Sequence, residues 1–447
     1  MKISLRKGLD IKLAGEVKDS GIADVEPHEY AVIPGDYPGF AAKVDVAEGD
    51  VVRVGSKILH DKNYPEICLV SPVSGRVKAI VRGERRKVLR VEIESDGLMT
   101  QLWEGKEKSP AGTIPTLGLL YRSGLFAQMR RRPFDLIPRP DIRPRDIFVT
   151  AFDSAPLATS LSERLGSKGK TYLEAAVEAL KPLTDGKVYI STGRDWPLGA
   201  IKGAEMVEVA GPHPAGNVGI QIANISPINK GEEVWTLDVT ILCRIGHLVS
   251  EGIVDTSAIV AVTGPEVATP CLIRTHEGAA IAPLVEGRLK ETPANKRIIS
   301  GNVLTGTAVE LSTGYLHYPW RQITVIAEGD DVDEFMGWAS MSPSKLSFSR
   351  TFPLSRLRRM FSPDARINGG RRAMIMSGEY DSVMPADIMV EYLLKAIMSH
   401  NIEEMEALGI YEIAPEDVAL CEFVDTSKIP IQQIVRDGLD FLRKETE

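Results

Sequence analysis

Cysteine is scarce in this chain of 447 residues, and the few that it has are far apart. They are Cys68, Cys243, Cys271 and Cys421. Such spacing forms neither a disulfide framework nor the CxxC pairs of a zinc site. The seven histidines are also scattered, and none stands at metal-ligand spacing from another. The composition therefore predicts a reduced, cytosolic protein that binds no metal.

Long apolar runs are absent as well. No stretch approaches the roughly 20 residues that cross a bilayer, so we expect no membrane span. The first residues lack the apolar core of a secretory signal. Recognition-helix, RNP and zinc-finger signatures are missing, which argues against nucleic acid as a partner. With 43% hydrophobic and 26% charged residues the chain resembles soluble globular proteins, and its length predicts three or four domains.

The net charge of −8 conceals two basic segments. Residues 121–145 hold seven arginines against two aspartates, a net charge of +5. Residues 350–372 hold seven arginines against one aspartate, a net charge of +6, which leaves −19 for the rest. Such segments suit docking to an acidic partner or to anionic lipid headgroups. The alternative is that individual arginines form ion pairs inside the protein.

Short β-branched segments broken by turns fill residues 30–95. They include Glu-Gly-Asp-x-Val at 48–52 and Ser-Pro-x-x-Gly-x-Val at 71–77, which are typical of hairpins. This order resembles the barrel-sandwich of biotinyl and lipoyl carriers. Those carriers attach their group to a hairpin lysine, and Lys62 lies near that place. Its neighbours depart from the carrier pattern, so we interpret Lys62 as a turn residue, with a swinging lipoyl arm as the alternative.

Strands and helical segments alternate in the next unit. The predicted strands lie at 147–150, 188–190, 206–209 and 259–262, with a helix at 171–181. Such alternation indicates an α/β sheet, in which glycine-rich turns can cradle phosphates. Two turns qualify, at 122–124 and 211–219, but neither reads GxGxxG. Ser123 and Leu125 bring side chains where a phosphate would need bare backbone, so we expect no flavin or dinucleotide there.

The last part of the chain is predicted to be a small β module followed by helices. Pro385 and Pro430 each suit the first position of a helix. A ferredoxin spacing CxxCxxCxxxC laid over the tail places its ligand positions at Pro415, Val418, Cys421 and Asp425. A second copy places them at Met374, Ser377, Tyr380 and Met384. One cysteine cannot hold a [4Fe–4S] cluster. The tail is therefore either a ferredoxin-like scaffold without its clusters or an ordinary helical domain with a buried cysteine.

The order of these units resembles the C subunit of the Rnf electron-transfer complex, and in part the NADH-binding flavoprotein subunit of complex I. Four strings are similar to the family of the A subunit of the Na⁺-translocating NADH:quinone reductase. They are Ser-Gly-Leu-Phe at 123–126, Arg-x-Arg-Pro-Phe at 130–134, Gly-Pro-His-Pro-Ala-Gly at 211–216 and Ile-x-x-Gly-x-x-Leu-x-Gly at 298–306. The resemblance covers nearly the whole chain. It also fits the missing cysteines, because the Rnf subunit keeps its clusters whereas this family has lost them.

The resemblance predicts a multidomain α/β and α+β fold of four units. They are a barrel-sandwich hybrid (lipoyl-like) domain at 1–110, a degenerate Rossmann-like α/β domain at 111–265, a β-grasp (SLBB-like) module at 266–330, and a C-terminal helical ferredoxin-like domain lacking clusters at 331–447.

The resemblance also implies a function. It predicts a peripheral subunit of a six-subunit complex on the cytoplasmic side of the bacterial inner membrane, which oxidises NADH, reduces quinone and exports Na⁺. NADH, flavins and Fe–S clusters would lie on other subunits, so this chain would hold no redox centre and be inactive alone. Its role would be structural, with an association with quinone. Two other classes stay open: an Rnf-C-like electron carrier with its own flavin at 121–126, and a lipoyl-type carrier modified at Lys62.

The sequence assigns no catalytic residue, but it supports two hypotheses about sites. A quinone headgroup needs an apolar slot with one or two hydrogen-bond donors. Phe126, Arg130 and Phe134 stand beside the turn at 122–124 and form the quinone hypothesis, and the alternative is that both phenylalanines belong to the core. The hypothesis for docking to partner subunits names Arg131, Arg132, Arg356, Arg358 and Arg359.

Overall fold

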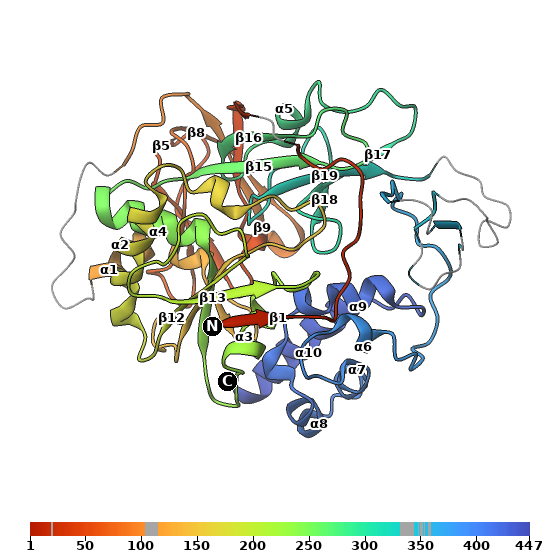
Figure 1. Cartoon of the computed structure of the whole chain (residues 1–447). Helices are drawn as coiled ribbons and strands as arrows, with labels where there is room; N and C mark the ends of the chain where they lie inside the picture. The colour runs from red at the N-terminus through yellow and green to blue at the C-terminus, as the bar shows by residue number, and fades with distance from the viewer. Residues whose placement is uncertain are drawn as a thin grey trace.

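The computed structural model describes residues 1–18, 21–102, 115–330 and 359–447, with a few further positions between 344 and 355. Within these residues the chain forms four sheets and a group of helices (Figure 1). The structure therefore confirms the predicted multidomain fold of mixed α and β elements.

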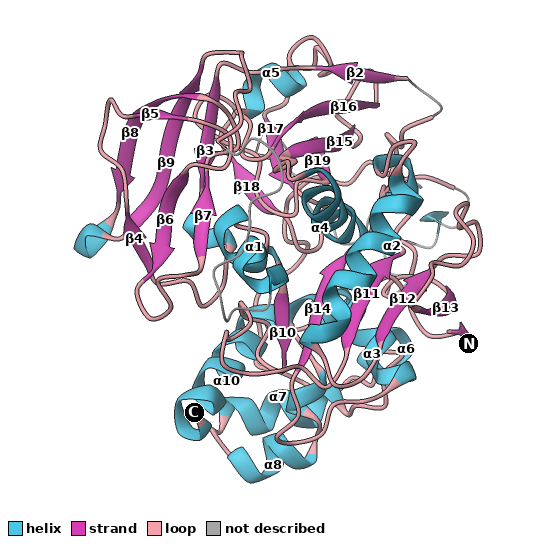
Figure 2. Cartoon of the chain, turned by 90° about the vertical axis from the view of Figure 1, so that its left-hand side faces the viewer, coloured by secondary structure: helices cyan, strands magenta, loops and turns pink. Residues whose placement is uncertain are grey.

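The first unit consists of two small antiparallel sheets that share one core (Figure 2). The four-stranded sheet contains β3 (Glu29–Val32), β9 (Val88–Ser95), β8 (Gly75–Arg82) and β5 (Val51–Val52). The three-stranded sheet contains β4 (Ala42–Val44), β6 (Lys57–Asp61) and β7 (Cys68–Val70). Alternate side chains such as Val91 and Ile93 point inward and are fully buried. Lys62 follows β6 in an exposed hairpin turn.

A six-stranded sheet forms the second unit, in the order β1-β13-β12-β11-β14-β10. The bounds are β1 (Lys2–Ser4), β13 (Glu205–Ala210), β12 (Val188–Thr192), β11 (Ile147–Ala151), β14 (Val234–Asp238) and β10 (Arg130–Arg132). The strands are parallel except β10, which pairs antiparallel with β14. The chain builds outward from β11 through β12 to β13 and then crosses to β14 on the other side of β11. The strand order therefore reverses between β11 and β14.

Helices cover both faces of this sheet, and β11 shows why. Ile147 and Val149 belong to the core beneath α2 (Gly169–Leu180) and α4 (Val239–Glu251), whereas Phe148 packs on the other face with Ile222 of α3 (Val218–Ile225). Successive side chains of a strand point to opposite faces, so a strand apolar at every position is buried on both sides. The predicted strands at 147–150, 188–190 and 206–209 and the helix at 171–181 are thereby confirmed.

The third unit is another six-stranded sheet, in the order β18-β17-β19-β15-β16-β2. Its strands are β18 (Thr307–Val309), β17 (Lys296–Ser300), β19 (Gln322–Ala327), β15 (Ser257–Thr263), β16 (Cys271–His276) and β2 (Ile22–Asp24), with α5 (Ile281–Val285) beside it. The strand predicted at 259–262 belongs here and not to the α/β sheet, because it pairs with β16 and β19. The N-terminal segment joins two units, since β1 and β2 are edge strands of the second and third sheets (Figure 1).

The C-terminal helices pack against α3 and the lower side of the α/β sheet (Figures 1 and 2). They are α6 (Tyr380–Val383), α7 (Val390–Met398), α8 (Ile402–Ala407), α9 (Ala419–Val424) and α10 (Ile431–Thr446). Pro430 directly precedes α10, as predicted. The prediction for Pro385 was wrong, because α7 begins at Val390 and the residue before this proline is extended. Within the described residues, none of the helices combines the length and apolar character of a membrane span.

Candidate functional site

A cleft of about 480 Å³ opens at the carboxyl ends of β11 and β14. All four units contribute to its walls, for example through Asp36, Asp238, Arg321 and Glu416. Ligands of open α/β sheets bind at the carboxyl edge where the strand order reverses, and this cleft lies at that place. We therefore take it as the candidate site.

The side of the cleft next to β14 carries a carboxylate that caps a helix. Asp238 is buried, and its Oδ1 accepts from the amides of Thr240 (2.6 Å) and Ile241 (3.0 Å) at the start of α4. Its Oδ2 accepts from the guanidinium of Arg321, which comes from the third unit. Burial alone would raise the pKa of Asp238, but Arg321 and Thr240 outweigh burial and hold this pKa below its usual range. The α4 N-terminus is therefore already occupied by a negative charge.

The side of the cleft next to the C-terminal helices carries a buried ion-pair cluster. Arg132 is 1% exposed and donates to Asp417 Oδ2 at 2.8 Å and to Glu416 Oε1 at 2.7 Å. Asp417 is equally buried, whereas Glu416 is a lining residue of the cleft and its side chain is 43% exposed. Burial raises the pKa of Glu416 above its usual range, against the opposing charge of Arg132.

His213 is a second titratable group at the cleft. Its Nδ1 lies 3.1 Å from Ser154 Oγ, which already accepts from the Gly216 amide at 2.8 Å. Burial lowers the pKa of His213. The ring Nε2 is buried and has no hydrogen-bond partner among the described residues.

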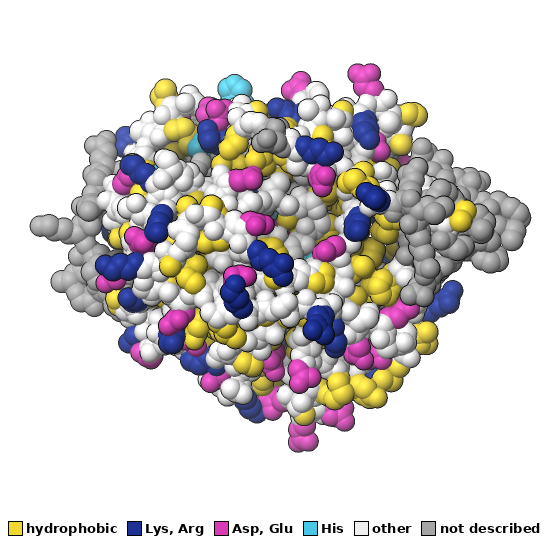
Figure 3. All heavy atoms as spheres, viewed as in Figure 1, with side chains coloured by type: hydrophobic (Ala, Val, Ile, Leu, Met, Phe, Trp, Pro, Cys, Tyr) yellow, Lys and Arg dark blue, Asp and Glu magenta, His cyan; other side chains and the backbone are white. Residues whose placement is uncertain are grey.

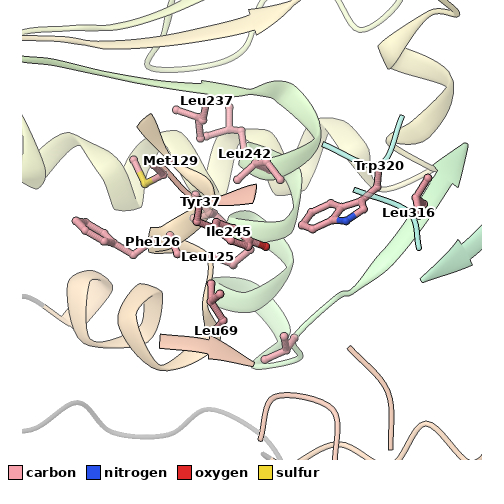
Figure 4. Close-up of a cluster of buried hydrophobic side chains, with 14 of the residues drawn as sticks. Tyr37, Leu69, Leu125, Phe126, Met129, Leu237, Leu242, Ile245, Leu316 and Trp320 are labelled. Atoms are coloured by element: carbon pink, nitrogen blue, oxygen red, sulfur yellow. The ribbon is translucent and has the colours of Figure 1, made fainter. Parts of the chain in front are cut away.

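The structure separates the three residues of the quinone hypothesis. Phe126 belongs to the buried core (Figure 4). Its ring centroid lies 4.8 Å from that of Tyr121 and 5.5 Å from that of Trp235. Phe134 is buried in the other core, beneath the C-terminal helices, and neither phenylalanine borders the cleft. Both side chains are therefore packed in the core, which was the alternative to the quinone hypothesis.

Arg130 is the member of that set that borders the cleft. Its guanidinium lies 5.0 Å from the Tyr318 ring centroid and donates to the carbonyl oxygens of Ala127 (2.9 Å), Met129 (3.0 Å) and Asp36 (2.8 Å). Its hydrogen-bond partners are thus uncharged carbonyls and its neighbours aromatic rings. Such a cation keeps its charge available to an acceptor in the cleft.

Two residues of the docking hypothesis need correction. Arg131 is 3% exposed and pairs with Glu233 (3.1 Å) and Glu447 (2.6 Å), and Arg132 belongs to the buried cluster. Internal ion pairs, the alternative considered from the sequence, therefore account for both. Arg356 and Arg358 lie outside the described residues, whereas Arg359 is exposed.

The positions overlaid on a ferredoxin have apolar or hydrogen-bonded environments. Burial raises the pKa of Cys421 to about 12, which disfavours its thiolate form. Tyr380 and Asp425, one from each overlaid set, meet in a hydrogen bond of 2.8 Å. Within 1–102, 115–330 and 359–447, where described, His, Cys, Asp and Glu form no group of three that could hold a metal.

Sequence reasoning missed four residues that line the cleft, which are Asp238, Arg321, His213 and Glu416. It also missed Asp417, the buried partner of Arg132. Asp238 carried a usable signal, because an aspartate between a buried strand and an apolar-periodic helix is a typical N-cap. No signal in the sequence indicated the pairing of Asp417 with Arg132, since 285 residues separate them.

Together, the fold and the cleft define a multidomain α/β protein. Its candidate cleft is lined by charged residues, such as Asp238 and Arg321, that pair with each other inside the protein. Three domain families match in chain order: the NqrA N-terminal barrel-sandwich hybrid domain at 3–96, the NqrA second alpha/beta domain at 117–254, and the NQRA C-terminal domain, of SLBB type, at 259–310. The predicted barrel-sandwich and SLBB units are thus confirmed.

Curated relatives are similar over almost the full length. The A subunit of the Na(+)-translocating NADH-quinone reductase from Serratia proteamaculans is 36% identical, covering 99% of this chain and 100% of the relative. The corresponding proteins of Yersinia pestis (34%; 99% and 100%) and Rhodopirellula baltica (33%; 99% and 98%) are similar to the same extent. The chain belongs to this family, that of the A subunit of the Na⁺-translocating NADH-quinone reductase. A solved NAD⁺-reducing [NiFe]-hydrogenase aligns with a TM-score of 0.38 and 13% identity over 75% of this chain and 64% of that one, too distantly to bear on the fold.

Proposed function

We propose that this chain is the peripheral A subunit of a membrane complex that oxidises NADH, reduces quinone and exports Na⁺. The observation that carries the proposal is the similarity over 99% of the chain to relatives named as the A subunit of that enzyme. An affinity tag on this chain tests it, because the NADH-oxidising and quinone-reducing subunits should be recovered with the tagged chain from membranes.

Within this proposal the chain is structural and binds no redox cofactor, while NADH, flavins and Fe–S clusters lie on other subunits of a six-subunit assembly. The carboxylate of Asp238 supports this role, because it caps the α4 N-terminus where a phosphate would otherwise bind. We infer that the second unit is a degenerate Rossmann-like domain, since β13-β12-β11-β14 follows the order 3-2-1-4 found in the doubly wound Rossmann sheet. The contact between Tyr380 and Asp425 supports a ferredoxin-like tail that has lost its clusters.

Quinone association is a further part of the proposal, and Arg130 is its best-supported residue. The guanidinium borders the cleft and lies over Tyr318, so it could donate to a quinone carbonyl beside an aromatic wall. Phe126 and Phe134 would act only by shaping the adjacent core. The two other classes stay testable: a flavin at 121–126 would give visible absorbance, and a carrier would show a mass increase at Lys62.

Docking on the cytoplasmic side of the membrane complex is proposed for the basic segment 350–372. Arg359, Arg371 and Arg372 are exposed there, and we retain Arg356 and Arg358 from the sequence. On the face shown in Figure 3, Lys and Arg side chains lie scattered among Asp and Glu, so this face carries no uniform positive field.

Converting Arg359, Arg371 and Arg372 together to Gln should release the subunit from membranes at lower salt than the parent. Exposed charge contacts are worth under about 1 kcal/mol each, so three are needed for a clear effect. They are screened over roughly 10 Å at 0.1 M salt. The measurement is the salt concentration that releases half of the subunit. The matched control converts Arg82, Arg85 and Arg86, exposed arginines of the first unit, to Gln. Equal release of both variants and the parent would contradict docking through segment 350–372.

A further inference from the structure

A groove of about 650 Å³ in the first unit is lined by basic side chains. It lies between the edge strand β4 and the turn that joins β8 to β9, and both strands stand at the outer side of this unit (Figure 2). Among the described residues, no aspartate or glutamate lines it. The basic residues are all exposed, and they are Lys43, Lys62, Arg82, Arg85, Arg86 and Lys87.

The charges of this basic groove are not neutralised within the part of the chain that the structure describes, where none of the six cations forms an ion pair. Other cations of the same unit do form them. Lys78 lies 2.6 Å from Glu29, and Arg90 lies 2.7 Å from Glu92. Like charges that line a concave surface concentrate a positive potential there. The basic groove therefore attracts anionic groups, although the chain as a whole has a net charge of −8.

The turn between β8 and β9 holds two of these arginines in a conformation that favours other residues. The Lys87 amide donates to the Glu84 carbonyl at 3.1 Å, and between them Arg85 and Arg86 have φ values of 52° and 59°. Hairpin turns with two positive φ values favour Asn-Gly, because most side chains are strained there. Arginine at both positions costs conformational energy, which supports a role for its charge in the groove.

The main chain of β4 adds a second kind of binding group. β4 is an edge strand, and among the described strands it pairs only with β6. The Asp45 amide donates to the Ile58 carbonyl at 3.0 Å. Because bonded and non-bonded pairs alternate along an antiparallel ladder, the amides and carbonyls of Ala42 and Val44 point away from β6. Both residues line the basic groove. Their free groups are about 7 Å apart, the two-residue repeat of an extended chain.

We propose that the basic groove binds an extended, acidic segment of a partner protein, which adds to β4 as a further strand. The main chain of the segment pairs with Ala42 and Val44, and its carboxylates lie against the arginines of the turn and against Lys43 and Lys62. A small phosphate compound matches the charges but not the spaced main-chain groups. A flat bilayer does not reach a strand edge inside a groove.

A fluorescent peptide of alternating threonine and glutamate tests the proposal with the full-length chain, by anisotropy at low salt. The triple variant Arg82→Gln/Arg85→Gln/Arg86→Gln should bind it about tenfold more weakly, because three charge contacts are lost. The matched control is Lys170→Gln/Arg194→Gln/Lys202→Gln, which removes three exposed cations of the second unit and should bind like the parent.

The strand-addition step is tested with the same peptide N-methylated on its central amides. This peptide keeps its charges but cannot pair with a strand edge, so it should bind at least about tenfold more weakly than the unmodified one. Hydrogen exchange of residues 42–44 should slow when the unmodified peptide is bound. Equal binding of the two peptides would show that charge alone attracts them, and strand addition would be wrong.

Three further results would overturn the proposal. One is the absence of peptide binding by the parent chain, since the cations would then only protect the edge strand from aggregation. Another is binding of tripolyphosphate or of phosphatidylglycerol vesicles without binding of the peptide. The partner is separate from membrane attachment through segment 350–372, so the Arg82/Arg85/Arg86 variant should leave membranes at the parent's salt concentration. Earlier release of this variant would assign the basic groove to membrane docking instead.

Discussion

Replacing Arg132 with leucine should lower the free energy of unfolding by about 3–5 kcal/mol. The guanidinium is 1% exposed and neutralises Asp417, which is equally buried. Without Arg132, Asp417 remains as an uncompensated charge in the interior, and Glu416 loses its partner as well. Urea unfolding, followed by fluorescence and by limited proteolysis of the C-terminal helices, measures the loss.

Arg139→Leu is the control for this change, because Arg139 pairs with the exposed Asp141 and should contribute under about 1 kcal/mol. The double variant Arg132→Leu/Asp417→Leu should be more stable than Arg132→Leu alone, since no unpaired charge is then buried. A cost for Arg132→Leu no larger than that for Arg139→Leu would show that the cluster does not hold the domains together.

Phe126→Ala should have an effect of similar size, about 3–5 kcal/mol, because it leaves a cavity in a closely packed core. The ring is fully buried and contacts the rings of Tyr121 and Trp235. Quinone reduction per folded complex should therefore change little, whereas the amount of folded subunit falls. Thermal melting of the chain and quinone reduction by the assembled enzyme are measured in parallel.

Arg130→Ala is the companion variant that separates packing from recognition. Arg130 borders the cleft and should affect stability less, while the KM for quinone rises about tenfold if a charge-assisted hydrogen bond is lost. Phe126→Ala that stays as stable as the parent but loses quinone reduction would reverse this assignment. Unchanged kinetics in both variants would show that neither residue takes part in quinone association.

Much of the fold could be predicted because its signals are local. The strand at 147–150 and the helix at 171–181 follow from residue type and periodicity alone. The strand at 259–262 was placed in the wrong sheet, because its partners β16 and β19 are set by tertiary pairing. The helix at Pro385 was predicted too early, since a proline permits a helix start without requiring one.

The site was less predictable than the fold. Arginines at 130–132 looked like one basic patch, but Arg130 borders the cleft while Arg131 and Arg132 are buried in ion pairs. Their carboxylate partners come from remote parts of the chain, Asp417 and Glu447 among them. A single sequence does not indicate which residues from distant parts of the chain lie close together.

The central claim is that this chain is a cofactor-free subunit of a Na⁺-exporting NADH:quinone reductase. The direct measurement is purification of the tagged chain from detergent-solubilised membranes, followed by identification of its partners and an optical spectrum of the chain after dissociation. We expect recovery of the NADH-oxidising and quinone-reducing subunits, Na⁺-stimulated NADH:quinone reductase activity in the preparation, and no flavin or iron on the dissociated chain. A tagged chain that is recovered alone, or that carries stoichiometric flavin or iron of its own, would contradict this claim.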